Sequence, residues 1–382
     1  MNSTRFRTVA IYAALVCGGI LIAFFLIELC VRIFFPQPSR FYVADPYIRT
    51  IHKANTSIIR KGEEYTARMT TNGQGFIGDE DFTIQKPPGV VRIAALGDSF
   101  TEGYVIDYTK VYPAVLEQKL NAAPRARYQV YNFGISSTGT AHQLLTYEHY
   151  IRAYHPDILV WQFFVGNDYA DNLLFQPEGT PPAETRSRLY WRTREILSNN
   201  FEAPRFILHR LERLENVKHI LADLSLVSRN LDHYDEEREY PFLYDIYTPP
   251  RARSNVFANE FKRTCQLAER LYAEAKADNV RFIALVVPTQ EELFPEDWRN
   301  ILSKNPSMQA KEWDLQQPRR SITDCLTENR IPMVDLYQIF VSVLANGGDR
   351  MYFMQDDHAN LYGQELIAEA LAERIVSSND TQ

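Results

Sequence analysis

The sequence predicts an α/β fold in three layers, α/β/α, in which helices cover both faces of a mostly parallel sheet, with a transmembrane helix at the N-terminus. Five short apolar runs, several rich in β-branched residues, alternate with helix-like stretches, as strands and helices do in parallel sheets. An uncharged apolar run opens the chain and is long enough to cross a bilayer. Together these patterns predict a membrane-anchored α/β protein.

The N-terminal run covers residues 8–27 and follows Arg5 and Arg7. A helix of this length spans a hydrocarbon core about 30 Å thick. Glu28 and Arg32 follow, four positions apart, where they can pair near the far interface. The alternative is a cleaved signal peptide, but no small-x-small cleavage site follows the run. Because basic flanks stay in the cytoplasm, we expect an uncleaved anchor with the body of the protein in the periplasm or outside the cell.

Composition divides the chain into parts. We expect a cytoplasmic tail and anchor over residues 1–38, and then a turn-rich extension over 39–89 that packs on the main domain. The main domain covers 90–376, and a short tail covers 377–382. Residues 171–255 interrupt the domain with a Pro- and Glu-rich start and an amphipathic pattern, which predicts a helical insertion. The pattern leaves open whether this insertion packs on the domain or forms a lid or a membrane-surface helix.

The main domain alternates strands and helices in a regular order. The expected strands are 90–96, 128–133, 156–165, 280–287 and 332–336. The expected helices are 112–120, 140–154, 257–277, 319–328 and 363–376. Ligands of such sheets bind beyond the carboxyl ends of the strands, so we expect the functional site there.

Composition also argues against some functions. The chain has 41 Lys and Arg against 48 Asp and Glu, a formal net charge of −7, and so lacks the basic surface that general nucleic-acid binding requires. The four cysteines show no CxxC spacing, and no phosphate-cradling loop is present, so we expect no metal and no cofactor. Cys265 and Cys325 form a disulfide or remain two separate buried thiols, and the sequence leaves both open.

The most informative local sequence is 97–103, Gly-Asp-Ser-Phe-Thr-Glu-Gly, directly after the expected strand 90–96. A loop at the end of a buried strand exposes the hydroxyl of Ser99, and Gly97 permits a tight turn there. A serine hydroxyl is a weak nucleophile until a base removes its proton. The tripeptide alone is also typical of a turn or a helix cap, so its interpretation depends on the rest of the chain.

Residues 97–103 resemble the first block of the SGNH, or GDSL-type, hydrolase superfamily, Gly-Asp-Ser-x-Thr-x-Gly. The other three blocks have counterparts in the same order. They are Gly134 after the second expected strand, 166–168 (Gly-Asn-Asp) after the third, and 356–358 (Asp-Asp-His) near the C-terminus. The resemblance covers roughly residues 90–376 apart from the insertion. It implies a flavodoxin-like sheet and a bacterial, membrane-anchored serine hydrolase.

The resemblance also implies roles for individual residues. Ser99 is the expected nucleophile, and His358 is the base that takes its proton and later returns it to the leaving alcohol. The N–H groups of Ser99 and Gly134 and the side chain of Asn167 are the expected oxyanion hole. Removing one such donor costs about 3 kcal/mol of transition-state stabilisation.

The carboxylates around these groups are less clearly assigned. Most members of the superfamily carry the orienting Asp three residues before the His, but Gln355 stands at that position. Asp356 matches the Asp-x-His arrangement of some bacterial polysaccharide acetyl-modifying members and is the expected partner of the imidazole, with the adjacent Asp357 as the alternative. Asp98 is expected to bind backbone amides and hold the nucleophile turn. Asp168 is expected to be a supporting loop carboxylate.

Three functions are consistent with these observations. The first is an esterase that hydrolyses an O-acyl ester, above all an O-acetyl ester, of an envelope carbohydrate or lipid. The second is an O-acyltransferase that uses the same serine to modify an exported polysaccharide. The third is a non-catalytic envelope binding protein. We expect the membrane as a partner and no nucleic acid, and the sequence does not indicate an oligomeric state.

Overall fold

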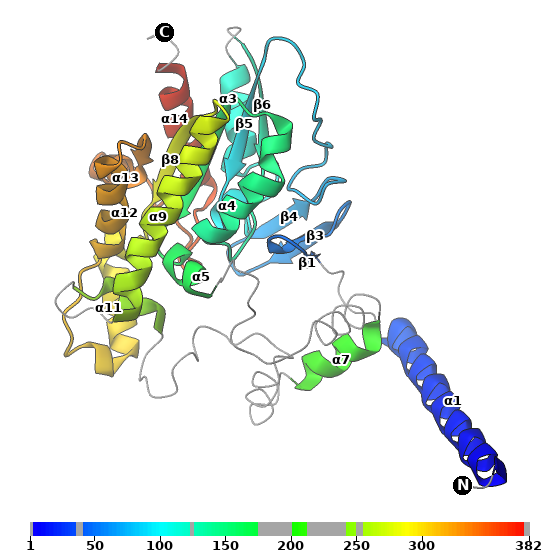
Figure 1. The fold of residues 1–382 in the computed structure, drawn as a ribbon. Helices are drawn as coiled ribbons and strands as arrows, with labels where there is room; N and C mark the ends of the chain where they lie inside the picture. Colours follow the sequence, from blue (N-terminus) through cyan, green and yellow to red (C-terminus); the bar gives the residue numbers. More distant parts are fainter. Residues whose placement is uncertain are drawn as a thin grey trace. The chain divides into compact units, whose positions relative to one another are not determined.

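A computed structural model describes residues 3–35, 41–122, 126–174, 201–211, 242–249 and 255–377 (Figure 1). The chain divides into two compact units. One unit contains the helices α1 (Ser3–Phe34) and α7 (Glu202–Leu211). The other unit contains the remaining described helices and strands, including the sheet and both hairpins that precede it.

The larger unit is built on a five-stranded sheet in which all neighbouring strands are parallel. The strands are β5 (Val90–Leu96), β6 (Arg127–Asn132), β7 (Ile158–Phe164), β8 (Arg281–Val287) and β9 (Met333–Asp335). Their order across the sheet is β6-β5-β7-β8-β9, which is the flavodoxin-like order. The fold class predicted from the sequence is therefore confirmed.

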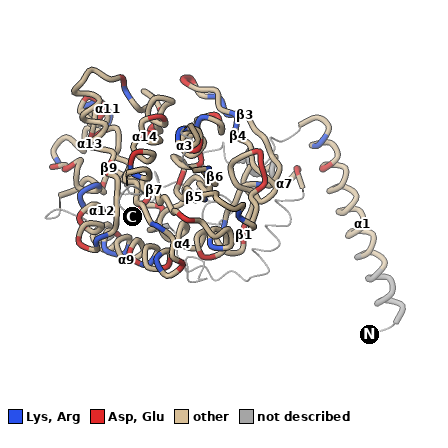
Figure 2. The backbone as a smooth tube through the Cα atoms, turned by 90° about the horizontal axis from the view of Figure 1, so that it is seen from above, with Lys and Arg blue, Asp and Glu red and all other residues tan. Residues whose placement is uncertain are grey.

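Helices cover both faces of this sheet (Figure 2). One face packs against α4 (Thr140–His149), α9 (Asn255–Ala277) and α12 (Gln317–Glu328). The other packs against α3 (Tyr112–Asn121), α13 (Leu336–Ala345) and α14 (Leu361–Ser377). Successive residues of a strand point to opposite faces, so Trp161 of β7 lies in the first core and Val160 in the second. Burial on both faces explains why the three inner strands β5, β7 and β8 are largely apolar.

Several shorter elements connect the main ones. They are α2 (Ser99–Glu102), α5 (Asp168–Leu174), α10 (Gln290–Leu293), α11 (Pro295–Lys304) and the 3₁₀ turns η1 (Ile151–Tyr154), η3 (Phe242–Tyr247) and η4 (Pro306–Met308). The helix expected over 140–154 ends at His149, because the chain tightens into η1 and then turns at His155 with a φ of 47°. Most of the insertion expected over 171–255 lies outside the described residues. The described parts are the end of α5, the helix α7, the turn η3 and the first residue of α9.

The extension expected to be turn-rich contains two antiparallel hairpins. The first pairs β1 (Tyr42–Asp45) with β2 (Arg49–His52), and the second pairs β3 (Ser57–Lys61) with β4 (Thr66–Thr70). The chain then reaches the edge of the main sheet, where Ile77 forms an antiparallel bridge with Asn132. The extension is thus joined to the main domain at the carboxyl end of β6.

The smaller unit contains the candidate membrane segment. Within α1, the stretch Ala14–Phe34 has a mean hydropathy of 2.6 and is long and apolar enough to be a membrane span or a signal sequence. Charged residues are marked only near its C-terminal end in Figure 2. There Arg32 Nε lies 2.6 Å from Glu28 Oε1, and the Glu28 carboxylate also accepts from the N–H groups of Glu202 and Ala203 at 2.9 and 2.8 Å. Glu28 therefore caps the N-terminus of α7.

A disulfide joins Cys265 of α9 to Cys325 of α12, two helices on the same face of the sheet. Of the two alternatives that the sequence left open, the structure has the bonded one.

Candidate active site

The nucleophile turn lies at the carboxyl end of β5, where the chain passes into the short helix α2. Asp98 is the N-cap of α2, and its Oδ1 accepts from the N–H of Phe100 at 2.9 Å. A Cβ on Gly97 would lie 2.3 Å from both Gln162 Oε1 and Thr101 Oγ1, so only glycine fits between β5 and β7 at this point. Ser99 follows as the first residue of α2 and is 7% exposed.

The structure brings Ser99 together with two residues from the C-terminal part of the chain. Ser99 Oγ lies 2.7 Å from His358 Nε2, and His358 Nδ1 lies 2.5 Å from Asp356 Oδ1. The same Asp356 oxygen accepts from the backbone N–H of His358 at 3.0 Å. The alternative carboxylate, Asp357, accepts instead from Gln290 Nε2 at 3.2 Å. A hydroxyl, an imidazole and a carboxylate thus form a continuous relay.

The charges around this relay favour the protonated form of the imidazole. Burial alone lowers the pKa of His358, but the hydrogen bond and the charge of Asp356 outweigh it, with smaller contributions from Asp98 and Asp357, so that the pKa lies above its ordinary value. Burial likewise raises the pKa of Asp356, but the hydrogen bond and charge of His358 hold it below its ordinary value. The imidazolium that forms when Ser99 loses its proton is therefore stabilised in place.

The three expected oxyanion donors differ in their availability. In the described part of the chain, the N–H of Ser99 and the side chain of Asn167 make no hydrogen bond. The N–H of Gly134, by contrast, donates to Asn132 Oδ1 at 2.9 Å and is already paired. A Cβ on Gly134 would lie 2.2 Å from the nitrogen of Glu102, so this glycine is needed for the close packing of its loop on α2.

Ser137, three residues further along the same loop, has an N–H without a partner among the described residues. Its backbone adopts a φ of 59°, and the residue is exposed. Sequence reasoning did not predict this conformation, because a left-handed backbone is usually indicated by Gly or Asn rather than Ser.

Three buried carboxyl groups lie beneath the site. Burial raises the pKa of Asp98 to about 6 and that of Asp171 to about 8, and it raises the pKa of Asp168 well above its ordinary range. Neighbouring carboxylates add to the shifts of Asp168 and Asp171. Asp168 Oδ2 accepts from the N–H of Phe164 at 3.2 Å, which ties the end of β7 to the start of α5. Of the carboxyl groups expected to support the site, Asp98 and Asp168 are therefore core groups, whereas Asp357 is exposed.

The extension forms part of the surroundings of the relay. The ring of Tyr104 stacks on His358 with a centroid distance of 5.5 Å, and the guanidinium of Arg60 lies 4.0 Å from the centre of the Tyr104 ring. The Glu64 carboxylate, at the turn between β3 and β4, accepts from the N–H groups of Met354 and Gln355 at 2.9 and 2.7 Å. Sequence reasoning missed Arg60 and Glu64 because the extension showed no recognisable catalytic motif.

One group of three closely spaced metal-ligand side chains occurs among the described residues, formed by Cys265, Glu269 and Cys325. Both of its sulfur atoms are bonded to each other, so the group does not fit a metal site.

A family model described as the GDSL-like lipase/acylhydrolase family matches residues 95–366, which include all the motif residues above. The chain belongs to this family. The GDSL-like lipases and acylhydrolases hydrolyse esters, so the chain is an ester-hydrolysing enzyme, as the resemblance implied. The hypothesis of a non-catalytic binding protein is left without support.

The solved structures that resemble this chain have low sequence identity to it. A lipase/acylhydrolase from Enterococcus faecalis is 14% identical, with 75% of this chain and 95% of that chain covered and a TM-score of 0.40. The acetyl xylan esterase AlAXEase is 12% identical, with 75% and 100% covered and a TM-score of 0.40. An acetyl-xylooligosaccharide esterase from Geobacillus Stearmophilus is 15% identical, with 75% and 94% covered and a TM-score of 0.40. A search of curated proteins finds no match to the chain. Sequence identities and TM-scores this low do not indicate the substrate of this chain.

Proposed function

We propose that the protein is a serine esterase that removes an acyl group, above all an acetyl group, from the hydroxyl of an envelope carbohydrate or lipid. Ser99 is the nucleophile, His358 the general base and acid, and Asp356 the carboxylate that orients the imidazole. The observation that carries the proposal is the relay of 2.7 Å from Ser99 Oγ to His358 Nε2 and 2.5 Å from His358 Nδ1 to Asp356.

The reaction follows from this geometry. Ser99 Oγ attacks the ester carbonyl carbon while His358 Nε2 takes the hydroxyl proton. The N–H groups of Ser99 and Gly134 and the side-chain amide of Asn167 are the proposed donors to the oxyanion, and that of Gly134 donates to Asn132 Oδ1 before substrate binds. The carbon–oxygen bond to the alcohol breaks, and His358 returns the proton to the departing oxygen. Water, deprotonated by the same imidazole, then hydrolyses the acyl-enzyme.

The apolar stretch Ala14–Phe34 suggests where this reaction takes place. We propose that α1 anchors the protein, with Arg5 and Arg7 on the cytoplasmic side and the catalytic unit in the periplasm or outside the cell. The disulfide between Cys265 and Cys325 supports this orientation, because structural disulfides persist in oxidising compartments.

A second candidate is an O-acyltransferase that uses the same relay. The observation that favours it is the Asp-x-His spacing of Asp356 and His358, which resembles polysaccharide acetyl-modifying relatives. In this case a sugar hydroxyl replaces water in the second half of the reaction. The two functions differ only in the acceptor of the acyl group.

The test uses the full chain in detergent and a fluorophosphonate probe, which reacts covalently with an activated serine. We expect the wild type and Ser303→Ala, a change of an exposed serine on α11, to be labelled and Ser99→Ala to remain unlabelled. Acetylated oligosaccharides and acylated lipids, with and without an unacylated oligosaccharide acceptor, are then analysed by mass spectrometry. Release of free acetate supports the esterase, and acylation of the acceptor supports the transferase. Labelling of Ser99→Ala at the wild-type level would exclude Ser99 as the nucleophile.

A further inference from the structure

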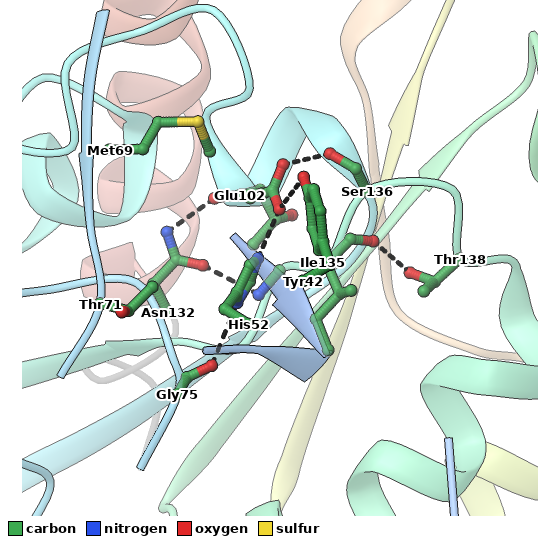
Figure 3. Close-up of polar contacts among 12 residues, drawn as sticks. Tyr42, His52, Met69, Thr71, Gly75, Glu102, Asn132, Ile135, Ser136 and Thr138 are labelled. Carbon is green, nitrogen blue, oxygen red and sulfur yellow. Dashed lines mark hydrogen bonds and ion pairs between the residues drawn. The ribbon is translucent and has the colours of Figure 1, made fainter. Parts of the chain in front are cut away.

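The nucleophile helix α2 carries a second, completely buried polar centre that the proposed reaction does not use. Glu102, three residues after Ser99, is 1% exposed, and the side chains of Glu102 and its partner His52 are fully inaccessible. Figure 3 shows the carboxylate at the centre of a cluster formed with Tyr42, His52 and Ser136. A buried carboxylate is costly unless it is paired and hydrogen-bonded, so this cluster has a specific reason to exist.

Each carboxylate oxygen of Glu102 is bound from a different part of the chain. Oε1 accepts from the hydroxyl of Tyr42 at 2.8 Å and lies 2.5 Å from His52 Nε2, both on the hairpin β1–β2. Oε2 accepts from the hydroxyl of Ser136, in the loop after β6. His52 Nδ1 faces the carbonyl of Gly75 at 3.1 Å. A carbonyl oxygen and a carboxylate oxygen are both acceptors, so both ring nitrogens of His52 face hydrogen-bond acceptors.

The ionisation of the neighbours agrees with this arrangement. Burial raises the pKa of Glu102, but the hydrogen bonds from His52, Ser136 and Tyr42 and the charge of His52 outweigh it and hold the pKa below its ordinary value. Burial and the charge of Glu102 raise the pKa of Tyr42, which keeps the phenol a hydrogen-bond donor. The Glu102 carboxylate is thus held by the side chains of Tyr42, His52 and Ser136.

The cluster joins the two backbone segments that carry the proposed oxyanion donors. The loop 134–138 packs on α2 so closely that a Cβ on Gly134 would meet the backbone of Thr101 and Glu102. Asn132 strengthens this contact, since its Nδ2 donates to the carbonyl of Thr101 at 2.7 Å while its Oδ1 accepts from the N–H of Gly134. The hydrogen bond from Ser136 to Glu102 is a further contact between the loop 134–138 and α2. A shift of Glu102 therefore moves Ser99 relative to the loop.

The extension binds this contact between α2 and the loop 134–138, although it lies outside the region that matches the family. The family match begins at residue 95, whereas Tyr42 and His52 lie in the preceding hairpin. The carbonyl oxygen of Gly75 faces Nδ1 of His52. Gly75 has a φ of 79°, and a Cβ there would lie 2.6 Å from the carbonyl oxygen of His52. The contact between extension and nucleophile helix is thus closely packed on both sides of the imidazole.

We propose that Glu102 is a positioning residue for the nucleophile and the oxyanion loop, and that the hairpin bearing Tyr42 and His52 is required for full catalytic activity. This inference rests on the proposed function of Ser99. The competing explanation is a cluster that contributes to stability alone. The two differ in what the loss of a single donor does to the reactivity of Ser99 in a folded protein.

The test removes one hydroxyl at a time from the full chain. Tyr42→Phe and Ser136→Ala each delete one donor to Glu102 and leave the packing nearly intact. We expect kcat on a short-chain nitrophenyl ester, and the rate constant of fluorophosphonate labelling, to fall about 10-fold in each, with KM nearly unchanged. Because both hydroxyls bind one carboxylate, the double variant is expected to lose less than the product of the single losses.

The matched control is Tyr147→Phe, which deletes a phenol hydroxyl that donates to Asp278 at 2.8 Å, the same distance as the bond from Tyr42 to Glu102. All variants are assayed well below their melting temperatures. We expect Tyr147→Phe to lower the melting temperature and to leave labelling within about twofold of the wild type. Wild-type labelling of Tyr42→Phe and Ser136→Ala, or an equal loss in Tyr147→Phe, would overturn the inference while the proposed function stands. A wild type that is not labelled at all would end both.

Discussion

The carboxyl end of the sheet and the hairpins of the extension contribute to the site in different ways. The turns after β5 and β7 carry Ser99 and Asn167, and the loop between α13 and α14 carries His358. The extension carries none of these, yet His52 binds the nucleophile helix and Glu64 binds the loop that leads to His358. Reacting groups are therefore concentrated in short motifs, whereas positioning is spread over contacts between residues far apart in the chain.

The largest loss of activity is expected at Asp356, the carboxylate that binds His358. Asp356→Asn removes the charge that holds His358 in place, and we expect kcat to fall by about 10²- to 10⁴-fold. The matched variant is Asp357→Asn, whose parent carboxylate binds Gln290 rather than the imidazole, and we expect it to retain most of its activity. Steady-state kinetics on both variants measure the contrast. Equal losses in the two would show that Asp356 is not the specific partner of His358.

The pH dependence of the same variant follows from the raised pKa of His358. Only the neutral imidazole accepts the proton of Ser99, so wild-type kcat/KM falls as the pH drops through this pKa. Asp356→Asn removes the main cause of the increase in the pKa, so the acid side of its profile is expected at lower pH than in the wild type. An acid side that does not move would contradict the assigned cause.

The next effect concerns stability, in the buried carboxyl groups beneath the sheet side of the site. Burial raises the pKa of Asp171 to about 8, so between about pH 4 and pH 8 the folded state keeps a proton that the unfolded state has lost. The free energy of unfolding therefore declines as the pH rises through this window, by at most about 1.4 kcal/mol per pH unit from this group. We expect the decline to be less steep in Asp171→Asn.

Urea unfolding at pH 5, 6, 7 and 8 measures this slope, with Asp324→Asn, an exposed carboxylate on α12, as the control. An unchanged slope in Asp171→Asn would mean that this carboxyl group is ionised in the folded protein at neutral pH. The sheet side would then carry a buried charge, and its core would be as dependent on a charged network as the extension is at Glu102.

The contrast between the regions also explains how much could be predicted from sequence. The strand β5 has the bounds expected for it, because burial on both faces requires a continuous apolar run. The hairpins of the extension were missed, since β1 has 4 residues and β3 has 5, and only β3 and β4 alternate in burial while β1 and β2 do not. Elements this short leave too weak a pattern for recognition without their partners.

At the site, the nearness of Ser99 and His358 was expected because motifs placed both at one end of the sheet. The pairing of the N–H of Gly134 was not expected, because residue type does not reveal which acceptor an amide meets. The binding of Glu102 by His52 was likewise not predicted, since the two residues lie 50 positions apart and no motif contains both of them. Long-range pairing depends on the packed structure.

The smallest effect that we expect returns to the extension, at Glu64. Its carboxylate accepts from the N–H groups of Met354 and Gln355, directly before the segment that carries Asp356 and His358. Glu64 is exposed, so water replaces the lost bonds in Glu64→Ala and the fold should persist, but the loop gains freedom next to the imidazole. We expect kcat to fall about 3-fold with little change in the melting temperature.

The neighbouring Glu63→Ala is the matched control for this change. It removes the same charge from the same turn, but within the described residues Glu63 makes no hydrogen bond to the catalytic loop. Kinetics on both variants at low and high salt separate the loss of a specific contact from a general loss of negative charge, because only the second effect is screened by salt. If Glu63→Ala and Glu64→Ala behaved alike, the influence of this hairpin would be electrostatic, and positioning by the extension would be confined to the buried contact at Glu102.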